Sequence, residues 1–162
     1  MDDQYRMKGV ESNAARENSP RSFGTSLAVA ARAHVYEAGK PAAEATAIYT
    51  LADPRDVRCP RYVGQTQDPR RRFVQHVRTA RLSVPDLTPW WVRSPKHRPL
   101  YEWIRALYRD EGRLPFMWVT EWIVASADAR AAERAAIMRL LAEGATLLNV
   151  EARCCGPQLP LL

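Results

Sequence analysis

The chain has 162 residues, 46% of them hydrophobic, so one hydrophobic core and a single folded domain are expected. No apolar run approaches about 18 residues, and the first ten residues lack a signal-like apolar stretch, so we expect a cytoplasmic protein without a membrane partner. Three cysteines, two of them adjacent at Cys154 and Cys155, indicate neither a disulfide framework nor a zinc motif.

The net charge of +6 is unevenly distributed. Residues 55–98 contain eleven Lys or Arg and three Asp, which gives this window +8 and leaves −2 for the rest of the chain. A concentrated basic segment is typical of proteins that bind polyanions, because arginine pairs with phosphate through two parallel N–H groups. The preference for 21 arginines over three lysines is also explained by GC-rich coding, but that bias does not explain the clustering.

The first half of the chain predicts a helix and a β-hairpin. Residues 1–24 are polar and without periodicity, and an Ala-rich helix is expected over Ser26–Ala38. The run AIYTL at 47–51 predicts a strand, DPRDVRCP at 53–60 a long hairpin connection, and RYVGQ at 61–65 the partner strand.

Helices dominate the second half. Asp68 and Pro69 are typical of the N-cap and first turn of a helix that ends before Pro85. A second helix with apolar spacing is expected from Leu100 to Gly112, a strand over 116–124, and a last helix over 127–143. The element order predicts a layered α/β (α+β) fold, with a small three-stranded sheet that contains antiparallel strands and is flanked by helices.

Several chemically useful side chains are expected to converge. Arg72 and His76 lie four apart on one helical face, beside the buried stripe rather than in it. Tyr49 and Tyr62 lie on the two hairpin strands and can project from the same side of the sheet, while Gly64 leaves room for a ligand near the backbone. Each residue alone is weak evidence, because a strand tyrosine is more often a half-buried packing residue and an arginine on a helix is usually solvated.

Glu133 is an anomaly of the last helix. It lies one turn before Ile137, which continues in an apolar stripe with Leu140 and Leu141. A carboxylate there is expected to be partly buried, and it must then be paired, protonated or bound to a cation. Alternatively, Glu133 lies at the edge of the stripe and pairs with Arg130 or Arg134.

Taken together, these residues resemble the GIY-YIG nuclease superfamily. The resemblance rests on AIYTL, YVG, an arginine ten positions after Tyr62, a histidine four further on, a late helical glutamate and a final LLNV. It covers residues 46–150, about two thirds of the chain, and implies a nuclease domain between an N-terminal extension (1–45) and a short tail (151–162). Two positions depart from the triplets, since Ala47 replaces a glycine and Val63 an isoleucine.

The resemblance implies catalytic roles residue by residue. Tyr49 would be the general base or the aligner of the attacking water, and Tyr62 would assist that water or the scissile phosphate. Arg72 would stabilise charge on the phosphoryl group, and Asn149 would fix the site by hydrogen bonding. His76 occupies a catalytic position where the superfamily often has histidine or tyrosine. Glu133 would hold one divalent cation, Mg²⁺ or Mn²⁺, and a single carboxylate suits Mg²⁺, which keeps most of its waters.

DNA is the expected partner. Gln65 stands where many members of the superfamily have lysine, so neighbouring cations are expected to contact phosphate instead. Trp90 either stacks on bases or covers the core, and Trp91 is expected to be a core residue. The residues predicted to contact DNA are Gly64, Gln65, Arg61, Arg70, Arg71, Arg78, Trp90, Arg93, Lys96 and Arg98.

Two functions follow from the sequence. The first is a divalent-metal-dependent DNA endonuclease, associated with a phage, a mobile element or restriction. The second is a non-cleaving nucleic-acid-binding module with the same fold. A chain that begins near Pro41 is expected to fold, because the preceding residues carry none of the motif. The sequence does not define the DNA recognised, the pathway or the oligomeric state.

Overall fold

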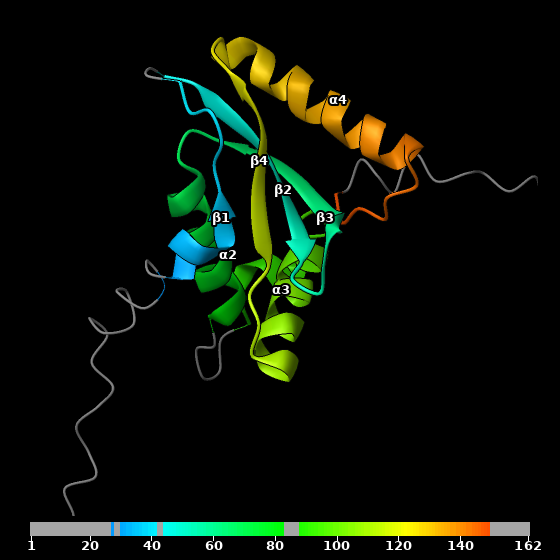
Figure 1. The fold of residues 1–162 in the computed structure, drawn as a ribbon. Helices are drawn as coiled ribbons and strands as arrows, with labels where there is room; N and C mark the ends of the chain where they lie inside the picture. Colours follow the sequence, from blue (N-terminus) through cyan, green and yellow to red (C-terminus); the bar gives the residue numbers. More distant parts are fainter. Residues whose placement is uncertain (1–26, 28–29, 42–43, 83–87, 150–162) are drawn as a thin grey trace, which may run out of the picture.

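The computed structural model describes residues 27, 30–41, 44–82 and 88–149 (Figure 1). The described residues form a mixed α/β fold. The elements follow in the order β1 (Val35–Tyr36), β2 (Thr46–Asp53), β3 (Asp56–Thr66), α2 (Pro69–Arg81), the 3₁₀ turn η1 (Trp90–Arg93), α3 (Arg98–Glu111), β4 (Phe116–Ile123), the 3₁₀ turn η2 (Ser126–Asp128) and α4 (Ala129–Ala142).

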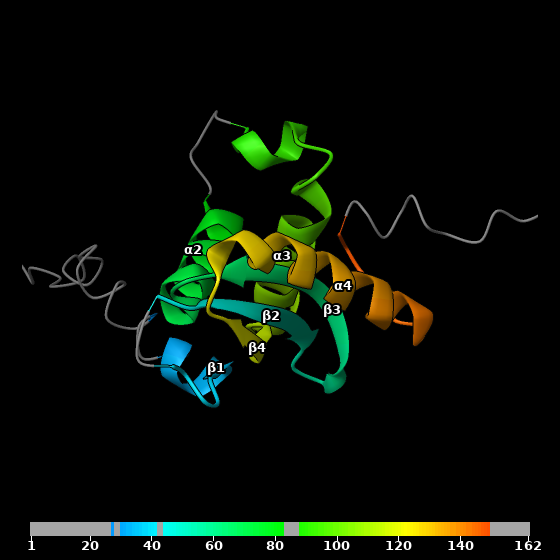
Figure 2. The same ribbon diagram turned by 90° about the horizontal axis from the view of Figure 1, so that it is seen from above.

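The sheet has four strands in the described part of the chain, rather than the expected three. Their order is β1-β4-β2-β3, and β2 lies between two antiparallel partners (Figure 2). The additional strand, β1, pairs in parallel with β4 through Val35 and Met117. The sheet is therefore mixed, with one parallel pair at its edge.

The additional strand replaces the end of the helix expected over Ser26–Ala38. Residues 30–34 are helical, but Val35 and Tyr36 are extended. Val35 is buried, and the ring of Tyr36 lies 4.3 Å from that of Trp118, measured between centroids. A β-branched and an aromatic side chain pack well on a sheet, and these contacts with β4 outweigh the helical tendency of the surrounding alanines.

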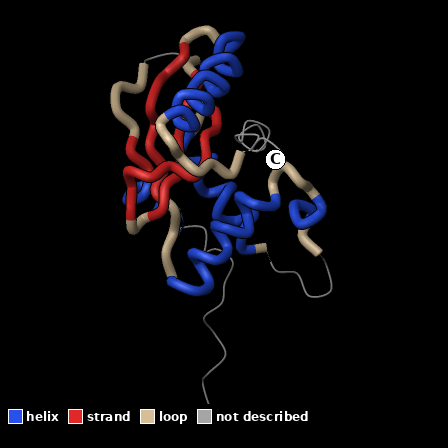
Figure 3. Tube along the Cα trace, turned by 90° about the vertical axis from the view of Figure 1, so that its right-hand side faces the viewer, coloured by secondary structure: helices blue, strands red, loops and turns tan. Residues whose placement is uncertain are grey.

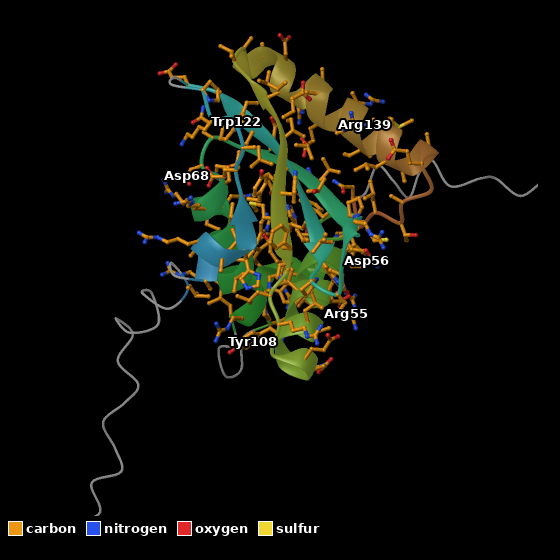
Figure 4. The ribbon with its side chains drawn as sticks, viewed as in Figure 1. Arg55, Asp56, Asp68, Tyr108, Trp122 and Arg139 are labelled. Carbon is orange, nitrogen blue, oxygen red and sulfur yellow. The ribbon has the colours of Figure 1, made fainter. Side chains whose placement is uncertain are left out.

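The hairpin connection is much shorter than expected. Asp53 pairs with Asp56, so only Pro54 and Arg55 separate β2 from β3. Figure 4 labels Arg55 and Asp56 at this turn. The Asp53 carboxylate accepts hydrogen bonds from the backbone N–H and the side chain of Arg55, at 2.9 and 2.8 Å. This local bonding closes the turn, and the exposed residues 57–59 show no alternation that would reveal a strand.

Helix α2 begins as the sequence predicts. Asp68 is its N-cap and accepts a 2.9 Å hydrogen bond from the backbone N–H of Arg71, while Pro69 occupies the first turn. Its apolar side, with Phe73 and Val77, is fully buried. The predicted helix at 100–112 is likewise present as α3, which ends at Gly112 in the left-handed conformation (φ 63°).

Two hydrophobic clusters lie on opposite faces of the sheet. Tyr49 and Leu51 point into the larger cluster, together with side chains from α2 and α3. Ile48 points the other way and packs, with Val63, against Ala136 and Ile137 of α4. Helix α4 thus lies along one side of the strands and the other helices cover the opposite side (Figures 1 and 3).

The folded core extends further toward the N-terminus than the expected domain boundary at residue 46. Leu27, Ala31 and Val35 belong to the larger cluster. The ring of His34 stacks on Phe73 of α2, with centroids 6.0 Å apart. The segment before residue 46 therefore supplies side chains to the domain, while the expected tail at 151–162 lies outside the described residues.

We now expect a chain that begins at Pro41 to be markedly less stable, contrary to the sequence-based expectation. It loses Leu27 and Val35, and burial of such side chains contributes about 1.5–3 kcal/mol each. Urea unfolding of this chain, beside one that begins at residue 24 as a control, measures the difference. Equal unfolding free energies would show that the N-terminal contacts contribute nothing.

Trp91 is a core residue, as predicted. It is 1% exposed, and its indole N–H donates a 3.0 Å hydrogen bond to the carbonyl oxygen of Thr79. Among the described helices, none is long and apolar enough to cross a bilayer.

Candidate functional site

The candidate site is built around the hydroxyl group of Tyr49. This oxygen lies 2.8 Å from Nε2 of His76, and Nε of Arg72 donates a long hydrogen bond of 3.5 Å to it. The ring of Tyr62 lies 6.4 Å from that of Tyr49 and 6.0 Å from that of His76, measured between centroids. Four residues predicted from the sequence are therefore neighbours, and we call them the tyrosine–histidine cluster.

The pairing of β2 with β3 brings the two tyrosines together. Tyr49 lies opposite Gly64 and Tyr62 lies opposite Leu51, so the phenol rings leave the same face from diagonal positions. A Cβ atom at Gly64 would lie 2.5 Å from the Tyr49 hydroxyl oxygen. The space beside Gly64 therefore holds the Tyr49 ring, and the expectation that it admits a ligand is wrong in this structure.

His76 and Tyr49 are more buried than expected. His76 is 1% exposed and Tyr49 is 0% exposed, so the imidazole lies in the core rather than beside it. The reason is the neighbouring helix: Tyr101 of α3 places its ring 5.9 Å from that of His76. Arg72 and Tyr62, by contrast, are half-buried and form the accessible side of the cluster.

Burial keeps both groups neutral. It raises the pKa of Tyr49, and the nearby Tyr62 and Glu133 raise it further, while the positive charge of Arg72 lowers it by less. Burial, together with Arg72 and His97, lowers the pKa of His76 to about 3. Near neutral pH the pair is a phenol hydrogen-bonded to a neutral imidazole. The sequence-based expectation that Arg72 depresses the pKa of Tyr49 is outweighed by desolvation.

The buried imidazole makes folding sensitive to acid. Above pH 6.5 His76 is neutral in both states, but between pH 6.5 and about 3 only the unfolded chain binds a proton there. Stability is thus expected to fall as the pH falls, by on the order of 1 kcal/mol per pH unit. Urea unfolding at pH 7 and pH 4.5 measures this loss. In His76→Leu, the loss should be about 2 kcal/mol smaller, and an unchanged loss would assign the acid sensitivity to other groups.

Two residues near the cluster were missed by the sequence analysis. Tyr101 is 5% exposed and contacts His76, and the ring of His97 stacks on Tyr101 at 6.3 Å. Tyr101 lies next to Leu100 and one turn before Ile104 in an apolar helix, where aromatic residues are ordinary core residues. Its separation of three residues from the buried Ile104 was the available signal that it also faces inward.

Glu133 belongs to α4, whose buried side chains pack on the face of the sheet opposite the tyrosine–histidine cluster. It is half-buried, and its negative charge contributes to the raised pKa of Tyr49. Ile137, one turn further along, is buried against the sheet, which orients this side of α4 toward the strands. The predicted partial burial of Glu133 is confirmed.

Asn149 holds strand β3 from the C-terminal side. Its side-chain oxygen accepts a 2.9 Å hydrogen bond from the backbone N–H of Val63, and its side-chain nitrogen donates one of 2.9 Å to the Val63 carbonyl oxygen. Leu148 adds a backbone hydrogen bond of 2.7 Å to the carbonyl oxygen of Arg61. Asn149 thereby fixes the strand that carries Tyr62 and Gly64, but it does not line the tyrosine–histidine cluster.

Asn149→Ala is expected to destabilise the fold by about 1–3 kcal/mol, because it leaves both polar groups of Val63 unpaired in a buried place. Denaturant unfolding measures the change. Asn149→Asp is the matched variant: it keeps the acceptor for the Val63 N–H but loses the donor. If only the alanine variant loses stability, the hydrogen bond donated by the Val63 N–H alone accounts for the effect.

The residues predicted to contact DNA separate into different surfaces. Arg70, Arg71 and Arg78 are exposed on α2, and Arg70 forms a 3.0 Å ion pair with Glu37. Gln65 and Arg61 are half-buried and alternate with Gly64 and Tyr62, so their side chains leave β3 on the opposite face from the cluster. Gln65 and Arg61 are therefore not brought to the tyrosines.

The other predicted DNA contacts surround η1. Trp90 is 56% exposed, and its ring lies 5.1 Å from that of His97 and 6.0 Å from that of Tyr101. Arg93 and Lys96 are exposed beside it. Arg98 is held in a 2.7 Å ion pair with Glu102. Trp90 is thus a surface residue rather than a core residue, and it borders the candidate site through Tyr101.

The described residues contain no group of three or more His, Cys, Asp or Glu that could hold a metal ion. The expected cation needs only one carboxylate, and Glu133, whose charge acts on Tyr49, offers an oxygen donor of the kind that Mg²⁺ prefers. The donor set therefore fits a cation that takes its other ligands from water and substrate.

Comparisons with known proteins do not place the chain in a family. The chain matches no family model, and no curated protein or solved structure matches it significantly.

Proposed function

We propose that the protein is a divalent-metal-dependent endonuclease of the GIY-YIG type, which hydrolyses phosphodiester bonds of DNA. The observation that carries this proposal is the convergence on the Tyr49 hydroxyl. His76 lies 2.8 Å from it, the guanidinium of Arg72 bonds to it, and the charge of Glu133 acts on it. Phosphodiester hydrolysis mainly requires positioning and stabilisation of negative charge, which an arginine and a carboxylate-bound metal ion can supply.

Tyr49 is buried and contributes by positioning its neighbours. Because its pKa is raised and its ring is buried, Tyr49 is a neutral hydroxyl that positions other groups, rather than a phenolate base. Its oxygen accepts a hydrogen from Arg72, and its own hydrogen can be donated to Nε2 of the neutral imidazole of His76. This chain of bonds fixes the direction of the Arg72 side chain.

Tyr62 and Arg72 are the members of the cluster that a substrate can reach, since both are half-buried. The Arg72 guanidinium contacts the scissile phosphate and stabilises the charge that grows on it. The Tyr62 hydroxyl aligns the attacking water. Glu133 would hold the Mg²⁺ ion, which when bound supplies Lewis-acid stabilisation of the phosphate oxygens.

The charge distribution supports DNA as the substrate. The window from 55 to 98 carries +8, and it includes Arg72 of the cluster and the exposed arginines of α2 and η1. A basic surface around a phosphate-directed site attracts a polyanion and holds it while one bond is cut.

Supercoiled plasmid provides the test. Incubated with the pure protein and Mg²⁺, it is expected to become nicked or linear, and to remain supercoiled with EDTA. Arg72→Ala and Tyr62→Phe should both stop the conversion, which excludes a contaminating nuclease. Cleavage by both variants at the wild-type rate would contradict the proposed site.

The burial of Tyr49 favours a second candidate, a nucleic-acid-binding module that does not cut. In that case the hydrogen bonds among Tyr49, Arg72 and His76 serve only to join α2 to the sheet. A wild-type protein that binds DNA but leaves plasmid intact in both Mg²⁺ and Mn²⁺ would favour this candidate.

A further inference from the structure

A groove lies on the side of α2 that faces away from the tyrosine–histidine cluster. Its volume is about 510 Å³. It runs between α2 and the short helical segment at residues 30–34 that precedes β1. The residues that line it are Ala31, Arg32, Arg70, Arg71, Val74, Gln75 and Arg78.

The groove is separate from the candidate catalytic residues. Arg72 and His76 point toward Tyr49, and neither of them lines the groove. Arg71, Gln75 and Arg78 are spaced four and three residues apart, which places them together on another side of the same helix. One polar contact joins the two sides, because Nη1 of Arg72 donates a 3.4 Å hydrogen bond to Oε1 of Gln75.

The groove carries unneutralised positive charge. Four of its seven lining residues are arginines, and one of them, Arg70, is paired with Glu37 at 3.0 Å. The side chains of Arg32, Arg71 and Arg78 have no ion pair or hydrogen bond within the described part of the chain, and all three are exposed. Helix α2 itself contains no acidic residue, and the carboxylate of its cap residue Asp68 accepts a hydrogen bond from the backbone N–H of Arg71. Three guanidinium groups therefore remain available to an anion.

The walls of the groove are held in place from the core side. His34 stacks on Phe73, and Ala31 is 2% exposed in the same cluster, so the segment at 30–34 is fixed against α2. Ala31 and Val74 give the groove apolar surface between the charges. A phosphodiester backbone has the matching chemistry, since apolar sugars alternate with phosphates that arginine binds through two parallel bonds.

We propose that this groove binds the phosphodiester backbone of the DNA at a point away from the bond that is cut. This inference rests on the proposed function, because it takes the DNA substrate as its ligand. It assigns Arg32, from the segment before the expected domain, to DNA binding. It also explains why three arginines of one small surface have no acidic partner among the residues that the structure describes.

The test compares two triple variants that lose the same charge. Arg32, Arg71 and Arg78 are changed to alanine in the groove variant, and Arg58, Arg109 and Arg139 in the control. The control arginines are exposed and lie on β3, α3 and α4, and Figure 4 labels Arg139 on α4. Binding to a fluorescent 20-base-pair duplex is measured in EDTA between 50 and 300 mM salt, after thermal unfolding has confirmed that both variants fold.

The groove variant is expected to bind more weakly, with a slope of log affinity against log salt reduced by about 2–3, since each lost phosphate contact contributes about 0.9. The control should change the slope by less than about 1. Equal slopes in the two variants would overturn the inference, as would a wild-type protein that binds no duplex. Because binding is measured without a metal ion, a protein that binds through the groove but never cuts would refute only the endonuclease.

Discussion

Glu133→Ala is expected to abolish Mg²⁺-dependent cleavage while DNA affinity stays the same or rises slightly. If Glu133 is the cation ligand, its removal eliminates several kcal/mol of stabilisation of the transition state, which is a loss of about 10³-fold or more in rate. Affinity is preserved because the change removes a negative charge from the neighbourhood of phosphate. The measurements are single-turnover cleavage of a labelled duplex and binding of the same duplex in EDTA.

Glu143→Ala is the matched control. Glu143 lies at the exposed C-terminal cap of α4, on the same helix, so it changes the net charge equally without approaching the cluster. If Glu133→Ala cleaves the duplex at the wild-type rate, Glu133 does not belong to the catalytic site and does not hold the metal ion. In that case Glu133 would be a helix-surface residue whose loss costs less than about 1 kcal/mol of stability.

Gly64→Ala is expected to destabilise the protein by about 1–3 kcal/mol and to stop cleavage. The added methyl group would lie 2.5 Å from the hydroxyl oxygen of Tyr49 and 2.6 Å from its Cζ atom, so the ring must move. Tyr49 is 0% exposed and packs between two strands and α2, so it has no free space to enter. Movement of the ring breaks its contacts with His76 and Arg72 and releases the Arg72 guanidinium.

A double variant tests whether the loss of stability comes from the contact between the added methyl group and Tyr49. In Tyr49→Phe the nearest oxygen is absent, so Gly64→Ala should cost less stability in that background than in the wild type. Denaturant unfolding of the four proteins gives the coupling, and plasmid nicking gives the activity. A Gly64→Ala protein that is as stable and as active as the wild type would show that the ring of Tyr49 is not confined by β3.

The residues that were predicted correctly carry their signals locally. Asp68 and Pro69 specify the start of α2 through capping chemistry, and the spacing of Phe73 and Val77 specifies the buried side. The neighbourhood of Tyr49 and Tyr62 follows from hairpin geometry, because adjacent antiparallel strands bring alternate residues to one face.

The features that were missed depend on contacts between distant segments. Strand β1 has only two residues, and its partners Met117 and Trp118 are about 80 positions away. Nothing within Val35–Tyr36 distinguishes it from the end of a helix. The burial of His76 likewise depends on Tyr101, which belongs to another helix. The Tyr49 ring occupies the space beside Gly64 only because of the register between the two strands.

The bonds that Asn149 and Leu148 make with β3 have a consequence for the behaviour of the protein at high concentration. A strand at the margin of a sheet presents free N–H and C=O groups that can pair with another molecule. Here the N–H and carbonyl oxygen of Val63 and the carbonyl oxygen of Arg61 are occupied by the chain's own residues. The margin of the sheet at residues 61–63 is thereby a poor template for intermolecular β-pairing, which disfavours aggregation of the folded chain through this part of β3.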